Sequence, residues 1–208
     1  MTKAEWLDVL EQRHGADLQR NFSSACVAVC GLGGLGSNVA ISLARAGVGT
    51  LLLIDFDRVD ISNLNRQQYS VSQLGMYKTE ALKQTLSELS PYCNVITHTV
   101  KMTEGNLSLL SDSSIICECF DNAERKAMLV NGISERYPEK YIVAASGMSG
   151  LHTGNSITTR KLGKRLYICG DGTSDVSDDS TLFAPRVMLC AAHQANTVLR
   201  IIAGKFEV

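Results

Sequence analysis

Apolar runs alternate with amphipathic stretches along the middle of the chain. Runs typical of strands occupy residues 26–30, 51–54, 94–100, 115–118 and 141–145. Helical patterns occupy residues 37–46, 77–89 and 122–137. The run at 26–30 is continuously apolar and is followed by glycine, which is the pattern of a parallel strand buried on both faces. Strands that alternate with helices in this way predict βαβ units and a mainly parallel sheet with helices on both faces.

The later part of the chain has a different texture. Residues 154–160 and 165–168 are predicted to be strands with no helical pattern between them, which predicts an antiparallel C-terminal extension of the sheet. The segment 169–180 is polar, acidic and glycine-containing, so we expect a surface loop. Pro185 then opens an apolar helix that runs to about residue 203, with proline in the first turn where it is favoured.

The first residues predict a separate helical segment. Residues from about 2 to 20 form one or two amphipathic helices, and we assign 1–24 to this segment. Its apolar side carries Trp6, Leu7, Leu10 and Leu18. Because the sequence shows no internal repeat and no linker, we expect one domain over residues 1–208.

Composition narrows the class of protein. The formal net charge is −1, so no net field favours nucleic acid as a partner. We find no apolar run long enough to span a membrane and no signal peptide, and we expect a cytoplasmic protein. The seven cysteines are odd in number and lie mostly in apolar runs, which predicts buried thiols in a reducing compartment. No Cys-x-x-Cys pair occurs, so a four-thiolate zinc site is not expected.

The sequence GLGGLG at residues 31–36 follows the first predicted strand and opens a helix. Glycine is needed there where a side chain would clash and where the backbone approaches a phosphate, and the helix N-terminus offers free N–H groups to an anion. Asp55 ends the next strand about 20 residues later, where a carboxylate can accept from a ribose hydroxyl. We therefore predict a Rossmann-like nucleotide-binding fold. The alternative is a glycine turn that serves only helix–sheet packing.

The segment 55–68 is unusually polar for a region so close to a nucleotide pocket. A dinucleotide has no need of a guanidinium, an ammonium and extra carboxylates there, whereas a triphosphate does. Arg66 and Lys78 can neutralise phosphate charge. Asn63 and Gln67 can donate hydrogen bonds to the same phosphates. This pattern favours ATP over NAD or FAD.

Carboxylates in the same region can add Mg²⁺, which prefers carboxylates together with phosphate oxygens. Asp57 or Asp121 can supply such a ligand. Asp121 follows a later strand, and the carboxyl ends of parallel strands face the ligand crevice. We therefore expect Asp55 and Asp121 to converge.

Several of these residues also have a purely structural interpretation. Arg58 and Asp60 are expected to be solvated. Asn63 can shape its turn, and Lys78 can be a surface residue at the start of its helix. Asp121 and Asn122 can form a helix cap.

Strings of residues along the chain resemble the ThiF/MoeB/HesA family, the bacterial relatives of the adenylation domain of ubiquitin-activating enzymes. In order, they are GLGGLGS, ARAGVG, IDFDRVDISNLNRQ, GMYKTEAL and CFDN. The resemblance runs from about residue 25 to residue 204, and the SNLNRQ string is its most specific part. The later strings VAASGMSG and FAPRVMLCAAHQANTVLRIIAG are similar to a short ThiF without zinc.

The resemblance implies an ATP-dependent adenylyltransferase with ATP and Mg²⁺ as cofactors. It implies that Arg66, Lys78 and Asp121 are catalytic, that Asp121 binds Mg²⁺ and that Asp55 binds ribose. The residues expected to contact the nucleotide are Gly31, Gly33, Gly34, Gly36, Asp55, Asp57, Asn63, Arg66, Gln67, Lys78 and Asn122.

The resemblance also implies partners. The expected substrate is a small ubiquitin-like sulfur-carrier protein, ThiS-like and of thiamine biosynthesis, which is activated at the C-terminal glycine of its Gly-Gly tail. A crossover loop at 170–182 would lie over that tail. Cys169, at the edge of the loop, is either a sulfur-transfer residue or a core thiol at a strand end. Members are typically homodimers in which an arginine reaches the partner's site, a role open to Arg13 or Arg20.

Other functions remain open at this stage. The same chemistry can act on a molybdopterin-synthase carrier or another small substrate. An NAD(P)-dependent oxidoreductase shares the glycine loop, but SNLNRQ argues against it. A scaffold that binds nucleotide without catalysis would have no need to keep Arg66, Lys78 and Asp121 together.

Overall fold

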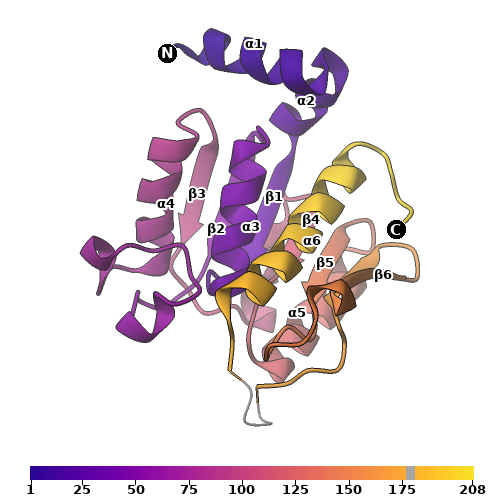
Figure 1. The fold of residues 1–208 in the computed structure, drawn as a ribbon. Helices are drawn as coiled ribbons and strands as arrows, with labels where there is room; N and C mark the ends of the chain where they lie inside the picture. The colour runs from indigo at the N-terminus through magenta and orange to yellow at the C-terminus, as the bar shows by residue number, and fades with distance from the viewer. Residues whose placement is uncertain (177–180) are drawn as a thin grey trace.

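A computed structural model describes residues 1–176 and 181–208. The described strands form one seven-stranded sheet in the order β3-β2-β1-β4-β5-β7-β6 (Figure 1). Neighbouring strands are parallel except β6 and β7, which are antiparallel. The strands are Cys26–Cys30 (β1), Thr50–Ile54 (β2), Asn94–His98 (β3), Ile115–Glu118 (β4), Tyr141–Ala145 (β5), Thr158–Leu162 (β6) and Leu166–Gly170 (β7). The predicted Rossmann-like sheet and its antiparallel extension are confirmed.

The position of β1 in the middle of the sheet explains why its sequence is apolar. Val27 and Val29 enter one apolar core, whereas Ala28 and Cys30 enter a second core on the other face of the sheet. All four side chains are fully buried. Because side chains alternate across a strand, a strand covered on both faces must be apolar at every position.

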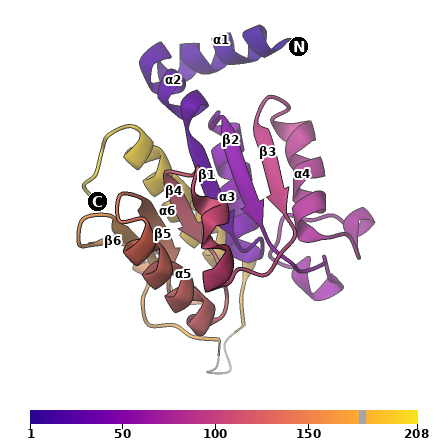
Figure 2. The same ribbon diagram turned by 180° about the vertical axis from the view of Figure 1, so that it is seen from behind.

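Helices cover the two faces unequally. The first core lies under α3 (Gly34–Arg45), α4 (Lys78–Leu89) and α6 (Ala184–Ile202), which Figure 1 shows on one face. The second core lies under α5 (Ala123–Arg136) and the 3₁₀ segment η3 (Glu104–Leu110). Figure 2, the view from behind, shows α5 in front of the sheet on this opposite face. Two shorter 3₁₀ helices, η1 (Ile61–Asn63) and η2 (Val71–Gln73), lie between β2 and α4.

Several predicted boundaries move. The helix after the glycine loop starts at Gly34 and not at residue 37, because the second half of the loop already makes the first turn: Ser37 N–H donates to Gly33 O at 3.1 Å. Strand β3 ends at His98, before the predicted residue 100.

The boundaries also move near the C-terminal strands. Gly154–Ser156 is a 3₁₀ turn (η4) capped by the Thr153 side chain, so the predicted strand at 154–160 begins only at Thr158. Strand β7 continues to Gly170, which shortens the predicted loop. Residues 177–180 of that loop, and of the expected crossover segment, lie outside the described residues.

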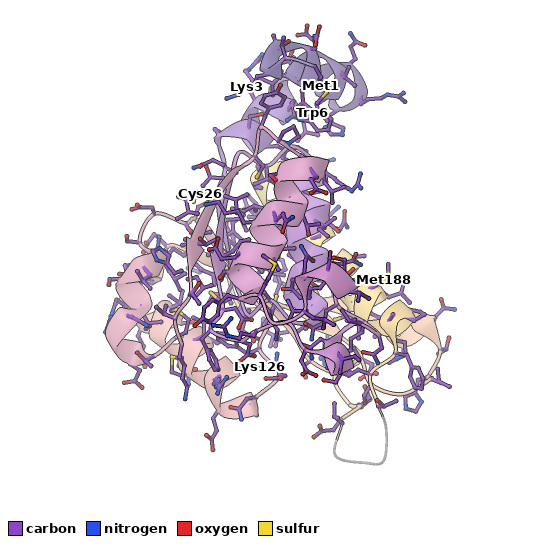
Figure 3. All side chains as sticks on the ribbon, turned by 90° about the vertical axis from the view of Figure 1, so that its left-hand side faces the viewer. Met1, Lys3, Trp6, Cys26, Lys126 and Met188 are labelled. Atoms are coloured by element: carbon purple, nitrogen blue, oxygen red, sulfur yellow. The ribbon has the colours of Figure 1, made fainter. Side chains whose placement is uncertain are left out.

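The N-terminal segment forms two helices, α1 (Lys3–His14) and α2 (Ala16–Ser24). They lie at the end of the sheet where β1 begins, and Figure 3 shows Trp6 there and Lys126 at the opposite end. Arg13 and Arg20 are therefore remote from the carboxyl ends of the strands of their own chain, and Arg20 pairs locally with Asp17. In the part of the chain that the structure describes, no helix has the length and apolarity needed to cross a membrane.

Candidate functional site

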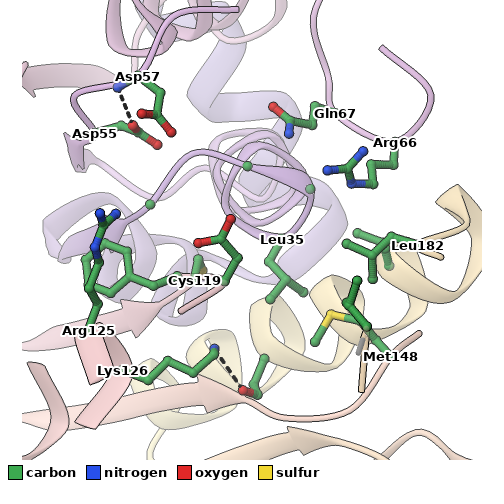
Figure 4. Close-up of a pocket in the computed structure, with 18 of the residues that line it drawn as sticks. Leu35, Asp55, Asp57, Arg66, Gln67, Cys119, Arg125, Lys126, Met148 and Leu182 are labelled. Atoms are coloured by element: carbon green, nitrogen blue, oxygen red, sulfur yellow. Dashed lines mark hydrogen bonds between the residues drawn. The ribbon is translucent and has the colours of Figure 1, made fainter. Parts of the chain in front are cut away.

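A cavity of about 660 Å³ lies at the carboxyl ends of the strands (Figure 4). This is the edge at which open parallel sheets bind their ligands. Ten of the predicted site residues line it: Gly31, Gly33, Gly34, Asp55, Asp57, Asn63, Arg66, Gln67, Lys78 and Asp121. Gly36 and Asn122, which were also expected to contact a nucleotide, do not line the cavity.

The glycines of the loop divide into two kinds. A Cβ on Gly36 would lie 1.8 Å from Gly31 O, and one on Gly31 would lie 2.8 Å from Cys119 O. These two glycines are required for packing between loop, helix and strand. A Cβ on Gly33, in contrast, would meet nothing closer than Gln67 Nε2 at 3.8 Å. Packing alone therefore does not explain Gly33, whose open side faces the cavity.

The N-terminus of α3 is available to an anion. Gly33 is its N-cap residue, and no side chain caps the helix. The first N–H groups of a helix carry partial positive charge and need an acceptor. A phosphate in the cavity would supply that acceptor.

Asp55 has a structural role that sequence reasoning missed. Its Oδ2 accepts from Leu32 N–H at 2.6 Å and its Oδ1 accepts from Asp57 N–H at 2.8 Å. The carboxylate thus ties the glycine loop to the chain that leaves β2. Burial raises the pKa of Asp55 above its ordinary value, although these two hydrogen bonds oppose the shift. Each carboxylate oxygen keeps a further lone pair for a ribose hydroxyl.

Lys78 is buried at the edge of the cavity. It is the first residue of α4, only 8% of its side chain is exposed, and its Nζ lies 3.2 Å from Asp57 Oδ2. The Asp57 side chain is half exposed. The ammonium is therefore held in place by a partner that solvent or a ligand can reach. The alternative interpretation, in which Lys78 is a surface residue at the start of its helix, is therefore wrong.

Arg66 and Gln67 keep unused hydrogen-bonding atoms. Arg66 Nη1 donates to Ser62 O at 3.0 Å and to Asn65 Oδ1 at 2.8 Å, but its buried Nε has no partner among the described residues. The same holds for the buried Oε1 of Gln67. Figure 4 shows both side chains beside the glycine loop. Since an unpaired buried polar atom costs free energy, these atoms indicate a missing ligand or water.

The Asn63 side chain stabilises the turn in which it lies. Its Oδ1 accepts from Asp60 N–H at 3.2 Å, which closes a capping box around η1. This is the turn-shaping role that the sequence left open. Asp60 is exposed as expected, and Arg58 stacks over the Tyr77 ring with its guanidinium carbon 3.8 Å from the centroid.

Asp121 and Asn122 differ in what their side chains contact. Asn122 is the N-cap of α5, with its Oδ1 accepting from Arg125 N–H at 3.0 Å. Asp121 is exposed at the cavity and makes no side-chain hydrogen bond or ion pair with the described residues. The cap therefore uses only Asn122 and leaves the Asp121 carboxylate available.

A metal ion at this site would depend on the ligand. Among residues 1–176 and 181–208, no group of three or more His, Cys, Asp or Glu side chains is placed to hold one. Mg²⁺ is characteristically held by one or two carboxylates plus phosphate oxygens and waters. Asp121 fits that donor set when a phosphate is bound beside it.

Lys126 is a cavity residue that the sequence analysis missed. Its Nζ donates to Glu118 Oε2 at 2.9 Å, to Glu118 Oε1 at 3.2 Å and to Ala145 O at 3.0 Å. Figure 4 shows Lys126 at the cavity. Glu118 is fully buried at the end of β4, and burial raises its pKa although the Lys126 charge opposes the shift. The signal was present in the sequence, since a carboxylate between Cys117 and Cys119 in a buried strand needs a cation.

Phe56 and Arg125 form a second missed pair. The Arg125 guanidinium carbon lies 5.1 Å from the centroid of the Phe56 ring, within the range of a cation–π interaction. Both residues line the cavity next to Asp55. A flat, partly exposed surface of this kind suits the base of a nucleotide.

The cysteines near the site are buried. Cys169 is fully buried in β7, and burial raises its pKa, although hydrogen bonds with Thr159 and Thr197 oppose the shift. Cys119 lines the cavity with 6% exposure, and burial raises its pKa as well. A raised pKa keeps a thiol protonated and unreactive.

The fold and the cavity together define a Rossmann-like α/β protein with an uncapped helix N-terminus, that of α3, at the cavity. Residues 8–208 match the model of the ThiF family, and the chain belongs to this family. The family resemblance inferred from the sequence is thereby confirmed.

Curated relatives carry the names of adenylyltransferases and activating enzymes. The chain is 36% identical over 142 residues to adenylyltransferase and sulfurtransferase UBA4 of Candida glabrata, covering 67% of this chain and 32% of that protein. It is 37% identical over 115 residues to molybdopterin-synthase adenylyltransferase of Haemophilus influenzae, with coverages of 54% and 47%. Ubiquitin-like modifier-activating enzyme 5 of Caenorhabditis briggsae is 31% identical over 191 residues, with coverages of 86% and 43%. The matched part is thus about a third to a half of the length of these relatives.

Solved structures share the fold more completely. The E. coli tRNA N6-threonylcarbamoyladenosine dehydratase, TcdA, in complex with ATP has a TM-score of 0.86 and 20% identity, covering 98% of this chain and 97% of that chain. The same enzyme in complex with AMP has a TM-score of 0.84 and 21% identity, with coverages of 95% and 94%. At these identities the likeness concerns the fold alone.

Proposed function

We propose that this protein is an ATP-dependent adenylyltransferase that activates the C-terminal glycine carboxylate of a small sulfur-carrier protein. The observation that carries the proposal is the convergence of an uncapped helix N-terminus, Arg66, Gln67 and Lys78 around one cavity. Curated relatives named adenylyltransferases support the same activity. The likeness to an ATP-bound enzyme of the same fold supports ATP as the nucleotide.

The reaction suits these residues. A carboxylate oxygen of the carrier forms a bond to the α-phosphorus, the bond from that phosphorus to the bridging oxygen breaks, and pyrophosphate leaves. The attacking carboxylate is already ionised at neutral pH, so the step needs no general base. Two anions must approach each other, so catalysis consists mainly of alignment and charge neutralisation.

Each cavity residue has a place in this scheme. Arg66 and Lys78 neutralise the phosphates, and Gln67 and Asn63 donate hydrogen bonds to them. Asp55 binds a ribose hydroxyl. Asp121 holds Mg²⁺, which supplies further positive charge to the phosphates when it is bound.

The specific partner is part of the proposal. We assign a ThiS-like carrier of thiamine biosynthesis as the substrate and a molybdopterin-synthase carrier as the alternative. We also propose a homodimer in which Arg13 or Arg20 reaches the partner's site, because neither reaches the cavity of its own chain. All seven cysteines are free thiols, which fits a reducing, cytoplasmic setting.

ATP–pyrophosphate exchange with a panel of purified carriers that end in Gly-Gly tests the proposal. We expect exchange that requires a carrier and is abolished when the terminal glycine is removed. The carrier with the highest kcat/KM identifies the pathway. Binding of NADH without exchange would instead indicate an oxidoreductase. Tight ATP binding without exchange on any carrier would indicate a scaffold.

A further inference from the structure

A buried ion pair joins the start of α6 to the end of β7. Arg186 Nη2 lies 2.5 Å from Asp171 Oδ2, and the two side chains are 5% and 6% exposed. Arg186 Nη1 also donates to His152 O at 2.8 Å and to Thr153 O at 2.8 Å. One guanidinium therefore holds the chain that follows β5 and the chain that follows β7 against the same helix.

Asp171 extends this arrangement into the chain after β7. Its Oδ1 accepts from Thr173 N–H at 2.9 Å and Ser174 N–H at 2.8 Å, and its Oδ2 accepts from Ser174 Oγ at 2.8 Å. Ser174 Oγ in turn accepts from Ser149 N–H at 3.1 Å. Packing is tight here, because a Cβ on Gly147 would lie 2.0 Å from Asp171 Oδ1.

The segments held in this way form one wall of the cavity. Residues 146–149 and 172–176 line it, whereas Arg186 and Asp171 do not. In Figure 4, Met148 lies on this wall, across the cavity from Asp55 and Asp57. The residues assigned to ATP and Mg²⁺ come from the glycine loop, the chain after β2, the start of α4 and the chain after β4. The wall held by the ion pair thus faces the nucleotide half without belonging to it.

A second hollow lies behind the same wall. It has a volume of about 440 Å³ and shares Thr173, Ser174 and Asp175 with the main cavity. Asp171 and His152 line this outer hollow. Thr173, Ser174 and Asp175 therefore line both hollows, and Asp171 accepts hydrogen bonds from the first two of them.

We propose that Arg186 and Asp171 are positioning residues that shape the acceptor half of the cavity, where the attacking carboxylate and the chain behind it lie. This inference rests on the proposed adenylation. The ion pair then contributes to recognition of the acceptor, whereas ATP binds at the opposite wall. The pair acts through the backbone of residues 146–149 and 172–176 and touches neither substrate.

Two conservative variants test the proposal. Arg186→Lys keeps the charge but replaces a planar fork with a compact ammonium that cannot serve the same set of acceptors. Asp171→Asn keeps an acceptor oxygen for Thr173 and Ser174 but removes the charge. The double variant Asp171→Asn/Arg186→Gln removes both charges and avoids leaving one of them buried and unpaired. Lys161→Gln, which alters an ion pair with the exposed Glu207, is the control.

The main measurement compares the two substrates in ATP–pyrophosphate exchange. We expect each conservative variant to raise the KM for the carrier by about tenfold or more, the size of a lost charge-assisted hydrogen bond. The dissociation constant for ATP should stay within about twofold of wild type, as should both constants in Lys161→Gln. Equal losses for ATP and carrier, or no change for either, would overturn the proposal. Failure of all three pair variants to fold would show that the pair serves the fold and not the acceptor half.

Hydrogen exchange separates this inference from the proposed function. In Arg186→Lys, the amides of Ser149, Thr173 and Ser174 should exchange faster, while those of β1 and α3 stay unchanged. This result in a protein without exchange activity on any carrier would retain the positioning role and reject adenylation. Unchanged protection of the three amides would reject the positioning role.

Discussion

The Lys78 ammonium lies 3.2 Å from the Asp57 carboxylate, and this ion pair joins the first residue of α4 to the chain that leaves β2. The lysine is almost completely buried, whereas the aspartate is half exposed. A long cationic side chain loses much of its rotamer freedom when it is fixed in one place. In this protein that cost is met before any ligand binds, so the charge is already in position at the cavity.

Lys78→Met should fold and lose catalysis. The substitution keeps the apolar stem and removes the charge, and Asp57 remains solvated. Loss of one electrostatic donor predicts a decrease of at least about 100-fold in kcat for ATP–pyrophosphate exchange. Lys83→Met, on the exposed side of the same helix, is the matched control and should keep wild-type exchange. Near-normal exchange in Lys78→Met would contradict the assigned role.

The two kinds of glycine in the loop can be separated by alanine substitution. Gly36→Ala places a Cβ 1.8 Å from Gly31 O and should destabilise the fold by about 1–3 kcal/mol or more in urea unfolding. Gly33→Ala meets no close neighbour and should leave the urea midpoint near that of wild type. Its methyl group would occupy the place where the backbone approaches phosphate, so ATP affinity should fall by about tenfold or more. Unchanged ATP affinity in Gly33→Ala would show that this glycine has no role in binding.

Asp121 and Asn122 should differ in what their loss affects. Asn122→Ala removes the cap of α5 and should cost about 1 kcal/mol of stability. Asp121→Asn should leave stability unchanged and raise the Mg²⁺ concentration for half-maximal exchange by about tenfold, the size of one lost charged contact. Glu124→Gln, exposed in the same helical turn, is the control for charge. An unchanged Mg²⁺ requirement in Asp121→Asn would assign the metal to another residue.

The carboxyl of Asp171 predicts a loss of stability in acid. Burial raises its pKa, but backbone hydrogen bonds from Ser174 and Thr173, the Ser174 hydroxyl and the Arg186 charge outweigh burial and lower it to about 2. The unfolded chain has the ordinary value of 3.8 and binds a proton first as the pH falls. The contribution of Asp171 is therefore fully present well above pH 3.8 and is lost as the pH falls towards 2.

Urea unfolding of wild type and Asp171→Asn at several pH values measures this contribution. We expect wild type to be more stable at pH 7 and the difference to shrink between pH 5 and pH 2. Other carboxyl groups titrate in both proteins, so their effects cancel in the difference. A difference that stays constant over this range would contradict the assigned ion pair.

Cys169 should be dispensable for adenylation. Its side chain is fully buried, and burial raises its pKa, both of which oppose nucleophilic attack. We expect Cys169→Ser to retain wild-type exchange and any covalent carrier conjugate that wild type forms. Loss of such a conjugate in the variant, with exchange preserved, would implicate the thiol in sulfur transfer.

Short sequence patterns predicted most of the fold. The apolar run of β1, the glycine loop and the helix after it follow from short stretches of sequence, because burial on two faces and the start of a helix each require particular residues. Boundaries were less certain where a turn competed with a strand. Gly154–Ser156 was predicted to begin a strand, yet the Thr153 side chain caps it as a 3₁₀ turn.

The candidate site could be predicted only in part from such short stretches of sequence. Arg66, Gln67, Lys78 and Asp121 do line one cavity, as their residue types and spacing predicted. The hydrogen-bond and ion-pair partners of the site residues could not be predicted from the sequence. Asp55 also secures the glycine loop, and Asn122 caps α5 without lining the cavity itself. Lys126 and Glu118 were missed because their pairing spans a strand end and the following helix.

The sequence by itself therefore determined the parallel sheet, the glycine loop and the set of charged residues that follow it. These depend on periodicity and on glycine, which act over a few residues. Only the tertiary structure decided that Lys78 is buried against Asp57, that Gly33 opens on the cavity while Gly36 packs against Gly31, and that Arg186 holds Asp171. Such contacts join residues that are far apart in the chain, and their distances are fixed by how the helices pack on the sheet.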